Sequence, residues 1–117
     1  MREKLNLLLE KHCVTIKESV GLLGEHLYRA REDGTAPREA LREANALAHQ
    51  LKGSSGTAGF HDICAAATVL YSHLNAMARD GAQPGEGVDQ AIELYQHLSR
   101  ASKEASPQSS SLYLARS

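Results

Sequence analysis

The sequence predicts an all-α protein, an up-and-down antiparallel bundle of four helices. Of its 117 residues, 33 are Ala or Leu and only 7 are Val or Ile, which favours helices over strands. Apolar residues recur at spacings of three and four along four segments, the period of an amphipathic helix. The segments between them are short, so consecutive helices are expected to lie antiparallel as neighbours.

A stop signal followed by a start signal separates the first two predicted helices. Apolar positions with the helical period run from residue 2 to about residue 33, which predicts one long helix, interrupted, if at all, near Gly21 or Gly24. Residues 34–37 then combine a glycine, a capping threonine and a proline suited to a first helical turn. A second helix should therefore begin near Pro37, and its pattern continues to residue 59.

The third helix is expected to start after Phe60 and to end near Gly81, followed by a glycine-rich loop over residues 81–87. The fourth helix is expected over residues 88–105, which makes residues 1–105 one bundle domain. Residues 106–117 are rich in serine and show no helical period. We expect this tail to be flexible, with docking as a short flap as the alternative.

Charge and cysteine content exclude several classes of protein. The 13 Lys and Arg against 14 Asp and Glu give a net charge of −1 without a block of like charge, which argues against nucleic-acid or membrane-surface binding. Cys13 and Cys64 form no CxxC pair, and Glu10 and Lys11 interrupt the first leucine run too early for a signal peptide or a membrane span. We expect a cytoplasmic protein whose partner is another protein. It should be a monomer, because one bundle buries its own four apolar stripes.

The informative residue of the second helix is His49. On a helical wheel at about 100° per residue, buried positions such as Leu51 and Ser55 lie opposite His49. The residues on the same face as the histidine are Arg42, Asn45, Gly53 and Gly56. A glycine inside a helix costs about 1 kcal/mol relative to alanine, so two glycines on an exposed face suggest a functional reason.

Phosphoryl acceptance would explain this combination of residues. A neutral imidazole is a competent nucleophile near neutral pH, Gly53 one turn away leaves room for another protein, and Lys52 can hold an anion. The alternative is that the glycines at 53, 56 and 59 permit close helix packing, with His49 as an ordinary surface histidine. His61 and Cys64 are too few for a metal site, and the inward stripes carry almost none of the Glu and His that a catalytic or metal-binding bundle needs.

The stretch from residue 49 to residue 59 resembles the core motif of the histidine-containing phosphotransfer (HPt) domain. That motif has a histidine, a Leu or Phe two residues on, then lysine, glycine, two small residues and a later glycine. The matching residues are His49, Leu51, Lys52, Gly53, Ser54, Ser55 and Gly59, and the family's pattern in the next helix is matched by Ile63, Ala67 and Leu70. One position departs from the family: Tyr71 stands where an acidic residue is common.

The resemblance implies that His49 accepts a phosphoryl group from a histidine kinase, hybrid kinases included, or from a receiver aspartate, and passes it to the receiver of a response regulator. It implies that Lys52 stabilises the phosphate, that Gly53 provides clearance and that Gln50 contacts the phosphate. The Mg²⁺ used in such a transfer would belong to the receiver, so no cofactor is expected on this chain.

The expected docking surface is the exposed face around His49. Beside Gln50 and Gly53, it should include Arg42, Asn45, Ala46 and Gly56. The chain is not expected to be an enzyme in its own right, because the residues after His49 are too few for an ATP-binding domain. The remaining alternative is a helical adaptor that binds a receiver or kinase without being phosphorylated.

Overall fold

The computed structural model describes residues 2–32, 37–80 and 84–112, and these residues form four long α-helices and one short 3₁₀ helix. The α-helices are α1 (Arg2–Glu32), α2 (Pro37–Thr57), α3 (His61–Asp80) and α4 (Pro84–Lys103), and the 3₁₀ helix is η1 (Pro107–Ser109). The described part contains no strand. None of its helices is long and apolar enough to cross a membrane.

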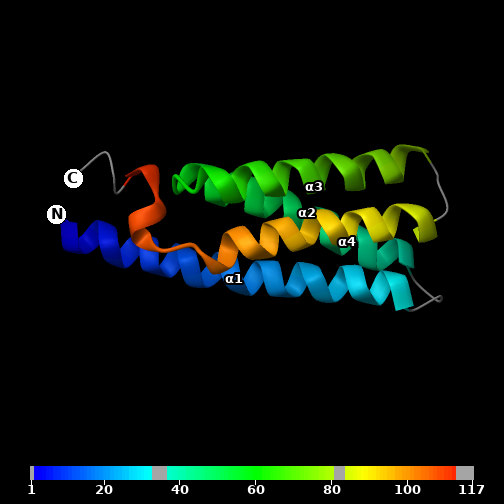
Figure 1. The fold of residues 1–117 in the computed structure, drawn as a ribbon, viewed down its shortest axis with the longest axis horizontal. Coiled ribbons are helices and arrows are strands. Elements are labelled where there is room, and N and C mark those ends of the chain that lie inside the picture. Colours follow the sequence, from blue (N-terminus) through cyan, green and yellow to red (C-terminus); the bar gives the residue numbers. More distant parts are fainter. Residues whose placement is uncertain (1, 33–36, 81–83, 113–117) are drawn as a thin grey trace.

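The four helices form the antiparallel bundle that the periodicity predicts. Each helix runs opposite to the one before it, and α4 returns beside α1 (Figure 1). The bundle is elongated, with extents of 50 × 20 × 18 Å. Both the start of α1 and η1 lie at the same end (Figure 1). The predicted fold class is therefore confirmed.

One apolar stripe from each helix fills the interior. The largest fully buried side chains of this core include Leu9, Ile16, Leu23, Leu27, Leu51, Leu70, Val88 and Leu98. Burying a side chain of this size contributes roughly 1.5–3 kcal/mol, so this core is a large favourable contribution to the stability of the bundle. Both cysteines are free.

The first helix is continuous through Gly21 and Gly24, as one long predicted helix requires. Gly24 is a packing residue, since a Cβ there would overlap the hydroxyl of Tyr95 on α4. One helix boundary differs clearly from the sequence prediction. The fourth helix begins at Pro84, inside the loop predicted for residues 81–87. Proline suits a first turn because it lacks an N–H group, and the imidazole Nε2 of His73 on α3 donates a hydrogen bond of 2.8 Å to the carbonyl of Gly87. The contact with α3 therefore stabilises a helical turn here, although the glycines of this segment favour a loop.

The serine-rich segment after residue 105 is expected to be flexible or to dock as a flap. In the structure, its residues 106–112 dock against the end of the bundle. Ser110 is fully buried, and its Oγ donates a hydrogen bond of 2.5 Å to the carbonyl of Ala58. The backbone N–H of Ser111 donates to the carbonyl of Gly59 at 2.9 Å. This short flap therefore covers the turn between α2 and α3. Residues 113–117 of the predicted tail lie outside the described residues.

The turn beneath this flap depends on Gly59. Two backbone hydrogen bonds close the end of α2: Phe60 N–H donates to Ser55 O at 2.8 Å and Gly59 N–H to Gly56 O at 3.2 Å. This pair of bonds is a Schellman motif, which needs a left-handed residue after the helix. Gly59 has φ of +83°, and a Cβ there would lie 2.7 Å from Ser110 Oγ.

Substitution Gly59→Ala should therefore lower the free energy of unfolding by about 1–2 kcal/mol, the cost of a side chain in left-handed backbone. Thermal and urea unfolding measure this loss. Gly21→Ala is the matched control: it lies in α1 with no described atom within 4 Å of an added Cβ, and it should stabilise the protein by about 0.5–1 kcal/mol. Equal effects of the two substitutions would contradict the role of the turn.

Candidate functional site

The core packing of α2 turns His49 toward solvent. Ala48, Leu51 and Ser55 of this helix are buried at 0%, 1% and 0% exposure. The hydroxyl of Ser55 donates to the carbonyl of Leu51, so the one polar group on the buried side is satisfied within the helix. His49 is exposed, as the helical wheel predicts, and its imidazole is accessible to another protein.

The aromatic ring of Tyr71 on α3 lies beside His49. The centroids of the imidazole and the phenol ring are 5.0 Å apart, with an interplanar angle of 41°. The Nζ atom of Lys52 lies 5.6 Å from the centroid of the same tyrosine ring. Tyr71 therefore contacts both His49 and Lys52, the histidine and the lysine of the sequence motif.

The sequence alone does not predict that Tyr71 contacts His49 and Lys52; it identifies Tyr71 as a departure from the family pattern. The distance along the chain hides the contact, because His49 and Tyr71 belong to different helices. One feature of the sequence points to this contact. Tyr71 occupies a position where the family commonly has an acidic residue, and the bundle places this position beside His49.

The α1 side of His49 carries a small groove. Gln50 and Ser54 line it from α2, opposite the apolar side chain of Leu8, which is 52% exposed. The remaining lining residues come from α1: Lys11, His12, Thr15, Ile16 and Ser19. Gln50 therefore belongs to the α1 side of the site, whereas the ammonium of Lys52 lies on the α3 side over Tyr71.

The two glycines that share the face of His49 have different surroundings. No described atom lies within 4 Å of a Cβ built on Gly53, so this position is open, as clearance for a partner requires. A Cβ on Gly56 would lie 3.2 Å from Sγ of Cys64 on α3. Gly56 therefore allows α2 and α3 to approach, as the alternative of close helix packing predicts for it, whereas Gly53 has no such role among the described residues.

The other predicted docking residues also separate into two groups. Arg42 and Ala46 are exposed, and so is Gln50. Asn45 is half-buried, and its Nδ2 donates a hydrogen bond of 2.9 Å to Oδ1 of Asn75 on α3. Asn45 therefore links two helices in addition to lying near the exposed face.

The charge around His49 suits an anion. The α2 residues within one turn of His49 include the cation Lys52 and no carboxylate. Arg42 lies two turns away on the same face, and Lys11 on α1 lines the adjacent groove. Positive groups at such a face attract phosphoryl oxygens and stabilise their charge. Among the described residues, no group of three or more His, Cys, Asp or Glu side chains is arranged to hold a metal ion.

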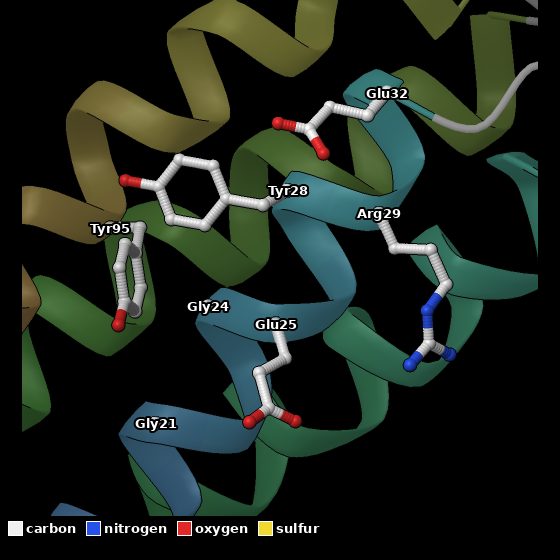
Figure 2. Close-up of a pocket in the computed structure, with 7 residues that line it drawn as sticks. All are labelled: Gly21, Gly24, Glu25, Tyr28, Arg29, Glu32 and Tyr95. Atoms are coloured by element: carbon white, nitrogen blue, oxygen red, sulfur yellow. The ribbon is translucent and has the colours of Figure 1, made fainter.

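A larger open groove of about 800 Å³ lies elsewhere, between α1 and α4. Tyr28 of α1 and Tyr95 of α4 are among the residues that line this groove (Figure 2). Their rings meet edge to face, with centroids 6.2 Å apart. Partial burial raises the pKa of Tyr95 above its usual value, and the neighbouring Glu25 adds to this rise. The groove shares no lining residue with the His49 site, so size alone does not locate the candidate nucleophile.

Comparison with known families agrees with this geometry. The family model described as Hpt domain matches residues 7–104, which includes most of α1 and all of α2, α3 and α4. Searches of curated proteins and of solved structures gave no match. The match covers well over half of the chain and places His49 within the family's domain. The chain therefore belongs to the Hpt domain family, whose members are histidine phosphotransfer modules of phosphorelays.

Proposed function

We propose that His49 is the phosphoryl acceptor of this chain, which takes the group from a kinase or a receiver aspartate and transfers it to the receiver of a response regulator. The observation that carries this proposal is the exposed imidazole of His49 with open space at Gly53 and a lysine three residues on. A nucleophile, clearance for a second protein and a cation for the phosphate are what such a transfer needs.

The covalent step is an in-line displacement at phosphorus. The Nε2 atom, the ring nitrogen farther from the backbone, attacks the phosphorus of an aspartyl phosphate while Nδ1 keeps its proton. An N–P bond forms, the P–O bond to the carboxyl group breaks, and the aspartate leaves as a carboxylate. Transfer to the next receiver reverses these events. The ammonium of Lys52 stabilises the negative charge on the phosphoryl oxygens.

We assign the Mg²⁺ of this reaction to the receiver, because the phosphorylated aspartate there supplies the oxygen ligands that Mg²⁺ prefers. The chain itself contributes the nucleophile and the lysine. The matched Hpt domain is not a kinase, so a kinase or receiver domain outside these residues supplies the phosphoryl group to His49 and takes it away.

The receiver is expected to dock on the face that surrounds His49. Ala46, Gln50 and Gly53 are exposed there, and Leu8 of α1 adds an apolar side chain across the small groove. Small and apolar residues at the centre with Arg42 at the edge are typical of a transient protein interface.

Phosphoryl transfer from a panel of Mg²⁺-loaded, ³²P-labelled receivers tests the proposal. We expect label on the chain that is stable in alkali and lost in acid, as phosphohistidine is, with the fastest transfer from the cognate receiver. Binding to a receiver without any label, from receivers or from kinases, would favour the adaptor alternative and overturn the proposal.

A further inference from the structure

Tyr71 is the described side chain that contacts both functional groups of the site. Its ring centroid lies 5.0 Å from the imidazole centroid of His49 and 5.6 Å from Nζ of Lys52. Among the described residues, the structure gives the imidazole of His49 and the ammonium of Lys52 no hydrogen-bond partner. The aromatic ring of Tyr71 is therefore a described contact that His49 and Lys52 share.

The packing of α2 on α3 determines where this ring lies. Leu70 and Leu74 anchor its stretch of α3 in the core at 0% and 3% exposure. One turn from His49, the Asn45 to Asn75 hydrogen bond joins the two helices. In the other direction, Sγ of Cys64 donates to the carbonyl of Lys52 at 3.4 Å. Two inter-helix contacts thus bracket Tyr71 and fix its distance from His49.

We propose that Tyr71 is a positioning residue for phosphoryl transfer: its ring restricts the rotation of the His49 imidazole and holds the Lys52 ammonium beside it until the phosphoryl group arrives. This inference rests on the proposed role of His49 as acceptor. Tyr71 takes part in no bond that forms or breaks, and it acts through the two residues that it touches.

The aromatic ring suits this task better than a charged side chain would in one respect. A carboxylate here would pair with Lys52 and compete with the phosphate for its ammonium. A cation–π contact at an accessible site is weak, whereas a phosphoryl group offers charge-assisted hydrogen bonds, so the ammonium passes from the ring to the phosphoryl oxygens. Tyr71 therefore positions the Lys52 ammonium without neutralising it in an ion pair.

Two substitutions separate the ring from the hydroxyl. Tyr71→Phe keeps the ring and should transfer phosphate within about twofold of the wild-type rate. Tyr71→Leu removes the ring and should reduce the single-turnover rate roughly tenfold, as expected for a nucleophile held less closely in its attacking geometry. Receiver affinity, measured by titration calorimetry, should stay the same in both variants, which assigns the loss to the transfer step.

Proton NMR supplies a readout that a merely structural residue would not change. The ring current of Tyr71 should shift the imidazole resonances of His49 in the wild type and in Tyr71→Phe, and this shift should disappear in Tyr71→Leu. Tyr28→Leu is the matched control, since Tyr28 also pairs with a ring and lies 5.2 Å under an arginine, Arg31. It should change neither the His49 resonances nor the transfer rate.

Each outcome decides the proposal. A wild-type rate in Tyr71→Leu, or an equal loss in Tyr71→Phe and Tyr71→Leu, would overturn it, since the ring would then not be the active feature. If no variant and no wild-type protein accepts label while the ring-current shift is present, the acceptor role of His49 fails and the contact with Tyr71 stands. The two failures are therefore distinguishable.

Discussion

We expect His49→Gln to abolish acid-labile phosphorylation of this chain while its free energy of unfolding changes by no more than about 0.5 kcal/mol, the range of an exposed substitution. The imidazole is exposed and its described contact is the ring of Tyr71, so the fold gains little from it. Glutamine keeps a polar side chain of similar reach but offers no nucleophilic nitrogen. Label incorporation from a phosphorylated receiver and thermal unfolding measure the two effects.

His97→Gln is the matched control, because His97 is also an exposed histidine in a helix, on α4. It should retain wild-type labelling and stability. Label on His49→Gln protein would place the acceptor at another histidine of the six in the chain. A loss of several kcal/mol in His49→Gln would instead assign His49 a structural role and contradict the exposed position found here.

The second large effect concerns Gly53. We expect Gly53→Gln to slow phosphoryl transfer by roughly 100-fold, because a long side chain one turn from His49 displaces the partner from its reacting distance. The same substitution should stabilise the protein by about 0.5–1 kcal/mol, because glutamine is a better helix former than glycine and no described atom obstructs its Cβ. Stopped-flow transfer kinetics and urea unfolding measure these opposite changes.

Gly21→Gln provides the control for this experiment. Gly21 is also an exposed helical glycine with no described atom within 4 Å of an added Cβ, and it lies on the α1–α4 groove instead of the His49 face. It should gain the same stability and keep the wild-type transfer rate. An unchanged rate in folded Gly53→Gln protein would show that a receiver reaches His49 without this clearance.

Helix period and residue type were sufficient to predict most of the fold. The spacing of apolar residues depends on local backbone geometry, so the four helices, their antiparallel order and the outward direction of His49 could be read along the chain. Pro84 shows the limit, because the glycines of residues 81–87 predict a loop where the helix in fact begins. The bond from His73 to Gly87 that secures this turn comes from another helix.

The sequence by itself determined the helices of the bundle, because their apolar period is local. It also determined the candidate nucleophile His49 and its adjoining lysine and glycine, because these lie within two turns of one helix. Only the tertiary structure decided what lies beside them. Tyr71 reaches His49 from α3, Gly56 makes room for Cys64, and Ser110 closes over the end of α2. Each of these contacts joins residues from different elements, and their distances depend on how helices and flap pack, which no spacing along one helix contains.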